Sequence, residues 1–239
     1  MKKKVETYFK HLNALGVEFV EVKKSSSKPA HSDKAAAPKP PANHASPKSA
    51  RGTLAELEAE VSKCLDCPLH KTRTRTVFGS GDPHARLMFV GEAPGAEEDA
   101  QGLPFVGRAG KLLTKMIEAE RALNVPRSSV YIANVLKCRP PGNRPPEPAE
   151  IAHCERFLKA QIALIKPSFI CALGAHAAHT LLKTGEPIGR LRGRWHEYEG
   201  IPLLATYHPS FLLRSPQYKA EAWKDLLILK EALNGKKGR

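Results

Sequence analysis

The chain has 239 residues, 26% of them charged, and a net charge of +14 at pH 7. This length suits one catalytic domain with additions, and the positive charge favours a polyanion such as nucleic acid over a membrane as partner. The basic start is interrupted by Glu6, Lys10 and His11, so it does not form an export signal, and nowhere do about 18 apolar residues run together. We therefore expect a soluble, cytoplasmic protein that makes no contact with a membrane.

Residues 1–50 are expected to lie outside the catalytic domain. Residues 1–23 carry Val5, Phe9 and Leu12 at roughly helical spacing, which predicts a small appended element that is a candidate for binding an unidentified partner. Residues 24–50 contain no aromatic residue and no aliphatic residue larger than alanine. Such a segment cannot bury a core, so we expect a disordered linker rich in Lys, Pro, Ala and Ser. The domain would then occupy residues 51–239.

Strands and helices are predicted to alternate along that domain. A capping box at Thr53 predicts a first helix. Four apolar runs are typical of buried strands, at residues 86–91, 130–136, 168–174 and 201–207. Helical patterns lie between and after them, at residues 111–123, 148–165, 175–183 and 218–233. The alternation predicts an α/β fold, with a four-stranded parallel sheet in a three-layer α/β/α arrangement.

Polar side chains follow three of the predicted strands. The first strand runs into Gly91-Glu92-Ala93-Pro94-Gly95, the second ends in Asn134, and the fourth is followed by His208. An ordinary strand-to-helix turn would explain the first segment alone. Ligands of parallel sheets collect beyond the carboxyl ends of the strands, however, and all three side chains lie at that edge. Their convergence therefore indicates a functional site.

Four of the five cysteines form a candidate metal site. Cys64 and Cys67 are a close pair, while Cys138 and Cys154 stand far along the chain. A zinc ribbon would need a second close pair, whereas four cysteines at flexible spacing can hold a 4Fe-4S cluster. By spacing alone, a cluster and a zinc ion fit about equally well. The fifth, Cys171, lies inside the third apolar run and is expected to be a small buried hydrophobic residue.

Taken together, these motifs resemble those of the family 4 uracil-DNA glycosylases, whose iron-sulfur ligands the four cysteines match. The resemblance covers residues 53–233 in order and implies a uracil-DNA glycosylase-like fold. It implies an enzyme of base excision repair that flips uracil from single- or double-stranded DNA and hydrolyses the N-glycosidic bond, leaving an abasic site. We expect it to act as a monomer. The segments that carry the resemblance are residues 91–95, 97–99, 104–107, 134–140 and 208–210.

The resemblance also implies how the base is bound. Phe105 would stack on the flipped uracil, a contact that any base can make. Asn134 would select uracil by pairing with N3–H and O4, where cytosine has the opposite polarity. Glu98 would crowd the C5 position and thereby exclude thymine.

The chemical roles are implied in the same way. His208 would hydrogen-bond O2 of uracil, where negative charge gathers as the bond breaks, and backbone amides near Gly91 and Glu92 would share this task. Glu92 would hold or activate the attacking water and stabilise the cationic sugar. Whether it acts as a true base stays open.

DNA contacts are implied around His208 and along the basic surface. Leu212 would be the apolar wedge that replaces the flipped base, and Ser210 and Arg214 would grip phosphates. The 4Fe-4S cluster on Cys64, Cys67, Cys138 and Cys154 would be structural. Further candidates for contacting DNA are Arg139, Arg144, Arg190, Arg192 and Arg194.

Two kinds of alternative remain. One is a related glycosylase that lacks the acidic residue or bonds covalently to the abasic product. Glu92 argues against the former, and the direct run from Cys138 to Arg144, without a basic insertion, argues against the latter. The other is a catalytically silent cluster protein, which would have no need for Glu92, Phe105, Asn134 and His208 together.

Overall fold

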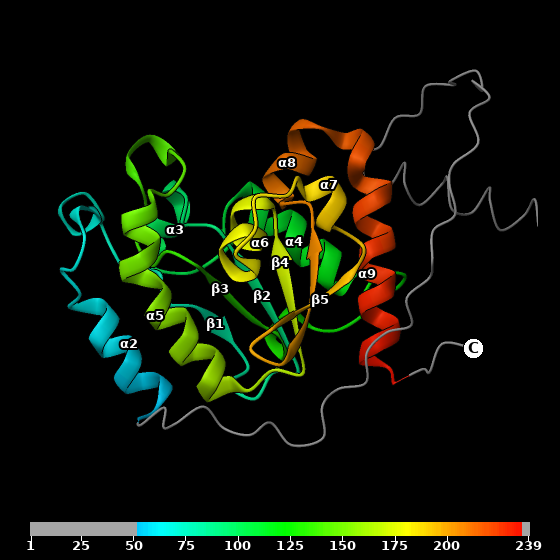
Figure 1. Ribbon diagram of the computed structural model, residues 1–239, viewed down its shortest axis with the longest axis horizontal. Coiled ribbons are helices and arrows are strands. Elements are labelled where there is room, and N and C mark those ends of the chain that lie inside the picture. The colour runs from blue at the N-terminus through cyan, green and yellow to red at the C-terminus, as the bar shows by residue number, and fades with distance from the viewer. Residues whose placement is uncertain (1–51, 236–239) are drawn as a thin grey trace, which may run out of the picture.

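The computed structural model describes residues 52–235, which form a sheet enclosed by helices (Figure 1). Residues 1–51 lie outside the described residues. They include the predicted appended element at residues 1–23 and the predicted linker at residues 24–50. Among residues 52–235, none of the helices has the length and apolarity needed to cross a bilayer.

The sheet has six strands in the order β1-β3-β2-β4-β6-β5. The four central strands pair in parallel, as predicted, and the two edge strands pair antiparallel to their neighbours. The edge strands were missed because β1 has only two residues and β5 carries polar side chains. A tight turn at Glu199 and Gly200, both at positive φ, joins β5 to β6. The strands are β1 (Ser80–Gly81), β2 (Leu87–Gly91), β3 (Tyr131–Asn134), β4 (Phe169–Leu173), β5 (Trp195–Tyr198) and β6 (Ile201–Thr206).

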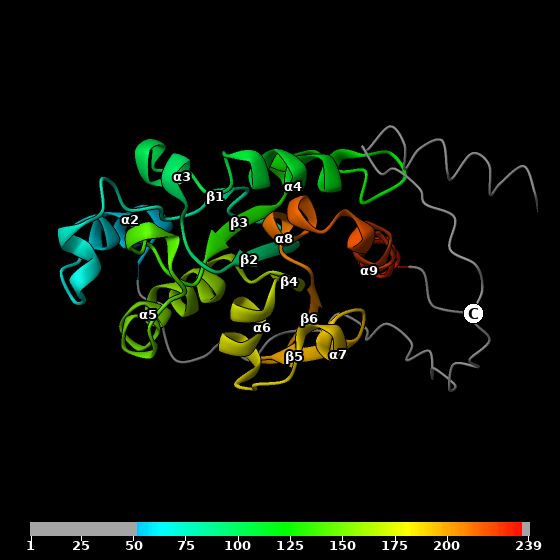
Figure 2. The same ribbon diagram turned by 90° about the horizontal axis from the view of Figure 1, so that it is seen from above.

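Helices cover both faces of the sheet, which confirms the α/β class. Figure 2 shows α4, α8 and α9 on one side and α5, α6 and α7 on the other. The predicted long helices are confirmed, except that α4 ends at Glu118 rather than at residue 123. The helices α3, α7 and α8 were not predicted. The helices are α2 (Leu54–Ser62), α3 (Ala96–Gln101), α4 (Arg108–Glu118), α5 (Pro148–Ile165), α6 (Ala175–Leu182), α7 (Ile188–Leu191), α8 (Pro209–Arg214) and α9 (Lys219–Leu233).

The two layers of helices explain why the central strands are apolar throughout. In β2, Leu87 and Phe89 join the core under α4 and α9, while Met88 and Val90 join the core under α5 and α6. Successive side chains of a strand point to opposite faces, so a strand covered on both sides needs apolar residues at every position. Cys171 in β4 is fully buried, as expected of a small hydrophobic residue.

Arg192 is not a DNA-facing residue, contrary to the sequence-based expectation. Its guanidinium lies between β6 and α9, where Nε donates to Asp225 Oδ2 at 3.0 Å. Thr206 Oγ1 donates to the same carboxylate oxygen at 2.6 Å. Asp225 is 1% exposed, so its charge depends on these partners rather than on water.

Arg192→Met should lower the free energy of unfolding by about 3–5 kcal/mol, because it leaves the Asp225 carboxylate buried without its cation. The control Arg194→Met removes the same charge from an exposed position two residues away and should change stability by less than about 0.5 kcal/mol. Urea unfolding of both variants measures the difference. Equal stability of the two variants would contradict the structural role of Arg192.

Candidate active site

A crevice of about 550 Å³ lies at the carboxyl edge of the parallel strands. This volume suits a small organic ligand. Each of the four parallel strands contributes to its lining: Glu92 follows β2, Asn134 ends β3, His176 follows β4, and His208 follows β6. The convergence of Glu92, Asn134 and His208 predicted from strand polarity is therefore confirmed.

Asn134 has an unsatisfied acceptor at the bottom of this crevice. The residue is 2% exposed, and its Oδ1 atom has no hydrogen-bond partner among residues 52–235. Buried polar atoms are nearly always paired, so such an atom indicates a place for a ligand donor. Gly91 leaves the space beside it: a Cβ atom there would lie 2.3 Å from Asn134 Oδ1 and 2.6 Å from Phe105 Cζ. Gly91 thus allows the amide and the ring to approach one another.

The Phe105 ring forms an apolar wall of the crevice. Its centroid lies 5.6 Å from that of the His208 imidazole, and the two planes are inclined by 37°. Gly174 permits His208 to come close to β4, because a Cβ atom on Gly174 would stand 2.8 Å from His208 Cβ. A flat ring, an amide and an imidazole therefore meet in one small space, which suits a planar polar ligand.

The hydrogen bonds of His208 define its tautomer. The backbone N–H of Ser210 donates to His208 Nδ1 at 3.1 Å, and the Ser210 hydroxyl lies 2.7 Å from the same nitrogen. A backbone N–H can only donate, so Nδ1 carries no proton and the neutral ring bears its proton on Nε2. Burial, with smaller effects of Arg214 and His176, lowers the pKa of His208 to about 4. At neutral pH the imidazole is thus an uncharged donor.

Glu92 and His176 form the polar side of the crevice. Burial raises the pKa of the Glu92 carboxyl, and the nearby His176 opposes that rise. His176 was missed by the sequence analysis, because it lies in the helical pattern of α6. The signal that could have revealed it is its place at the same sheet edge, two residues beyond Gly174.

Glu98 lines the crevice and also holds the loop that carries Phe105. Its Oε1 atom accepts hydrogen bonds from the backbone N–H groups of Val106 at 2.9 Å and Gly107 at 3.0 Å. Its other oxygen stands close to Gly95, where a Cβ atom would approach Oε2 to 2.7 Å. The carboxylate therefore fixes the turn that follows Phe105, and Gly95 leaves room for it.

Leu212 does not project from the surface, contrary to the expectation that it forms a wedge. It is 1% exposed and packs in the core shared by α4 and α9, because α8 turns this side chain inward. The apolar side chains of α8 that keep some exposure are Phe211 and Leu213. Ser210 and Arg214, the predicted phosphate contacts, both line the crevice.

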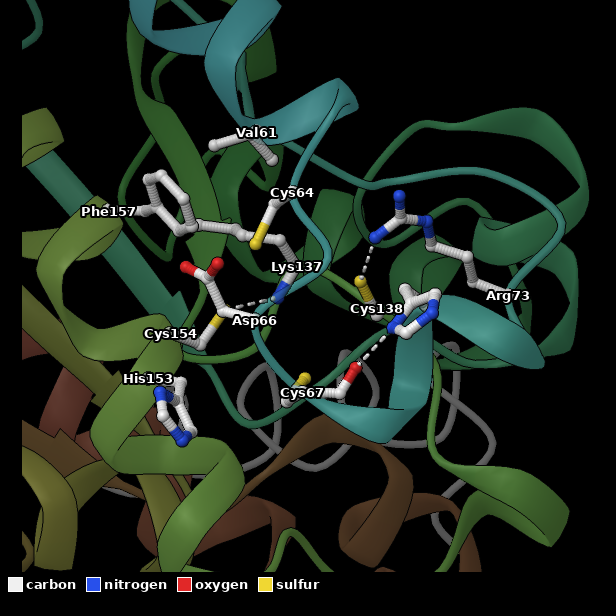
Figure 3. A pocket seen from close by; sticks show the side chains of 11 residues that line it. Val61, Cys64, Asp66, Cys67, Arg73, Lys137, Cys138, His153, Cys154 and Phe157 are labelled. Atoms are coloured by element: carbon white, nitrogen blue, oxygen red, sulfur yellow. Dashed lines mark hydrogen bonds between the residues drawn. The ribbon is translucent and has the colours of Figure 1, made fainter.

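The four candidate ligand cysteines surround a second, narrow cavity. Figure 3 shows Cys64, Cys67, Cys138 and Cys154 around this space, although they come from distant parts of the chain. Two sulfur atoms accept hydrogen bonds: Arg73 Nη1 lies 3.2 Å from Cys138 Sγ, and the backbone nitrogen of Lys137 lies 3.2 Å from Cys154 Sγ. Such donors stabilise thiolates, the form in which cysteine binds metals.

The four cysteines of this cavity are the type of ligand that an iron-sulfur cluster takes. Burial raises the pKa of Cys67, Cys138 and Cys154, so without a metal these groups stay protonated. Within residues 52–235, no group of three or more His, Cys, Asp or Glu side chains is placed to hold a metal ion. An iron-sulfur cluster takes each thiolate at a separate iron, so its ligands need not converge on one point.

Lys137 contacts both the strand end at the crevice and a cysteine of the second cavity, which the sequence analysis did not predict. Its side chain is almost fully buried, and Nζ donates to the backbone oxygen of Asn134 at 2.8 Å and to Gln161 Oε1 at 2.6 Å. Gln161 in turn donates to Tyr131 Oη at 3.2 Å. Lys137 thus supports the strand end that presents Asn134 while its backbone reaches Cys154.

We expect His208 to remain neutral between about pH 5 and 8, because its pKa of about 4 lies below the ordinary value of 6.5. Nitrogen-detected NMR of the imidazole measures the tautomer and the titration. It should show a protonated Nε2 and an unprotonated Nδ1 across this range. A midpoint near 6.5, or a proton on Nδ1, would contradict this assignment.

Comparison with known proteins shows the family of this chain. Residues 78–227 match the model of the uracil DNA glycosylase superfamily. The chain is 42% identical to the type-4 uracil-DNA glycosylase of Archaeoglobus fulgidus, over 77% of this chain and 95% of the relative. It is 47% identical to the type-4 uracil-DNA glycosylase of Thermotoga maritima, over 69% and 86%. Identity to the type-5 uracil-DNA glycosylase of Mycobacterium leprae is 29%, over 66% and 86%. The chain belongs to the type-4 uracil-DNA glycosylase family.

Proposed function

We propose that this protein flips uracil out of single- or double-stranded DNA and hydrolyses its bond to the deoxyribose, as the first step of base excision repair. The observation that carries the proposal is the unpaired Oδ1 atom of Asn134, buried beside the Phe105 ring. A flipped uracil would contact both groups: its face would stack on the Phe105 ring, and its edge would pair with the Asn134 amide.

Asn134 would distinguish uracil from cytosine by polarity. Uracil N3–H donates to Asn134 Oδ1, and uracil O4 accepts from the amide nitrogen. Cytosine has an acceptor at N3 and a donor at C4, so two buried pairs would be mismatched. Glu98, whose carboxylate lines the crevice, is the candidate to exclude the methyl group of thymine.

His208 would stabilise the leaving base. As the bond between N1 and C1′ breaks, the electron pair moves onto the uracil ring and negative charge develops at O2. The neutral Nε2–H group of His208 can donate to that oxygen, and a donor aimed at developing charge lowers the barrier. Backbone amides near Gly91 and Glu92 would add to this stabilisation.

Glu92 would act on the sugar and on the attacking water. The sugar gains positive charge as the base departs, and an ionised carboxylate stabilises that cation. Water then adds its oxygen to C1′, and Glu92 orients it and takes up its proton. The proton taken up by Glu92 then passes to the departing uracil anion through solvent, so the products are free uracil and an abasic site and Glu92 is ionised again.

The contacts to DNA would come from the region of α8. Ser210 and Arg214 line the mouth of the crevice, where an approaching backbone would place its phosphates. Exposed arginines outside the crevice, such as Arg190 and Arg194, would add affinity that does not depend on sequence. The monomeric state stays a prediction.

Cys64, Cys67, Cys138 and Cys154 would hold a 4Fe-4S cluster. When bound, the cluster would supply a rigid crosslink between the end of α2, the segment after β3 and helix α5. This proposal is supported by the shared cavity of the four cysteines and by family membership. The residues of the crevice perform the hydrolysis.

The function is tested with an oligonucleotide that contains a single uracil, followed by alkaline cleavage of abasic sites. The protein should release uracil, and Glu92→Gln should slow single-turnover release by about 10²–10⁴-fold, the usual contribution of such a group. Glu97→Gln, the same change on an exposed residue outside the crevice, should leave the rate unchanged. Intact strands after incubation with the parent protein would overturn the proposal.

Iron and acid-labile sulfide analysis of purified protein tests the cluster. We expect about four of each per chain and no zinc. Cys138→Ala should lose the iron, because it removes one ligand, whereas Cys171→Ala should retain it. Stoichiometric zinc, or full iron content in Cys138→Ala, would contradict the assignment.

A further inference from the structure

Phe105 has an unusual backbone conformation for a bulky residue. Its φ angle is +52°, in the left-handed region that costs free energy for residues other than glycine. Such a conformation persists only where the surroundings hold it. The groups that hold this turn therefore determine where the Phe105 ring stands.

Arg127 holds the amino side of this turn. Nη2 donates to the backbone oxygen of Pro104 at 2.8 Å and to that of Phe105 at 3.1 Å, and Nη1 donates to Thr114 Oγ1 in α4 at 2.9 Å. The planar guanidinium thereby connects two consecutive carbonyl groups to a helix. A lysine has no such fork of donors.

The carboxyl side of the turn is held by an opposite charge. Glu98 accepts from the N–H groups of Val106 and Gly107, the two residues that follow Phe105. Below the turn, Gly110 leaves room for the Phe105 carbonyl group, because a Cβ atom there would lie 1.8 Å from that oxygen. The carbonyl that Arg127 binds is therefore enclosed on the other side by α4.

Arg127 stands behind the crevice wall rather than in it. It does not line the crevice, and it lies 22 residues beyond Phe105 at the start of the short helical turn that precedes β3. Burial lowers the pKa of its guanidinium, while Glu118 and Glu98 oppose that shift. An arginine remains charged in such surroundings, so both hydrogen bonds to the turn are charge-assisted.

We propose that Arg127 is a positioning residue for base recognition, which holds Phe105 in its left-handed conformation so that the ring is in place before uracil arrives. This inference rests on the proposed function, because the ring serves to stack on the flipped base. A wall that is already ordered does not have to lose conformational freedom at the moment of binding. Small displacements of the groups that position a substrate strongly lower the reaction rate.

A double-mutant cycle tests this role through Phe105. Arg127→Met should lower the single-turnover rate of uracil release by about tenfold to a hundredfold, since the ring loses its support. In a Phe105→Ala background the same substitution should cost less than about threefold, because residues that act through one group are not additive. The control Arg121→Met removes an exposed charge from the same connection and should have no effect in either background.

Two further measurements separate the possible outcomes. The affinity for uracil-free DNA should be unchanged in Arg127→Met; a parallel loss of affinity would identify a phosphate contact and overturn the proposal. An equal loss of rate in both backgrounds, or no loss in the parent, would also overturn it. If Arg127→Met does not fold, the cycle is run with Arg127→Lys, which keeps the charge without the fork. An inactive parent protein would instead refute the glycosylase function itself.

Discussion

Parallel pairing of β3, β2, β4 and β6 brings four strand ends to one edge of the sheet, and the whole crevice depends on this constraint. Each strand is buried on both faces and can carry polar groups only where it ends. Asn134 and His208 therefore line one crevice, although two strands lie between β3 and β6 and 74 positions separate the two residues in the numbering. Glycines at the same edge, Gly91 and Gly174, let the side chains approach as closely as a flat ligand requires.

The segment from Asn134 to Cys138 connects the crevice with the cysteine cavity. Asn134 faces the crevice, the Lys137 side chain supports its backbone from below, and Cys138 faces the cysteine cavity. A cluster that fixes Cys138 and Cys154 would thus also fix the strand end that carries Asn134. The turn of Phe105 is likewise held by charged side chains, because Arg127 and Glu98 both hydrogen-bond to its backbone. In both places charged side chains hold the backbone that carries a residue of the crevice.

The sequence predicted what depends on local pattern and strand polarity. The apolar runs predicted the central strands, and the polar residues at their ends predicted that Glu92, Asn134 and His208 converge. It could not predict β1, whose two residues carry no pattern, nor the inward turn of Leu212, which depends on how α8 packs. Lys137 and Arg127 were missed for a related reason, because their roles lie in contacts to backbone oxygens that no motif encodes. The substrate and the cluster came from resemblance; family membership supports the substrate, whereas the cluster stays a prediction.

A crystal structure with free uracil in the crevice tests the central claim most directly. We expect the base to stack on Phe105, with N3 at hydrogen-bond distance from Asn134 Oδ1 and O2 at hydrogen-bond distance from His208 Nε2. This arrangement would pair Asn134 Oδ1, a buried crevice acceptor that has no hydrogen-bond partner among the described residues. Uracil bound elsewhere, or bound with Asn134 Oδ1 still unpaired, would contradict the account.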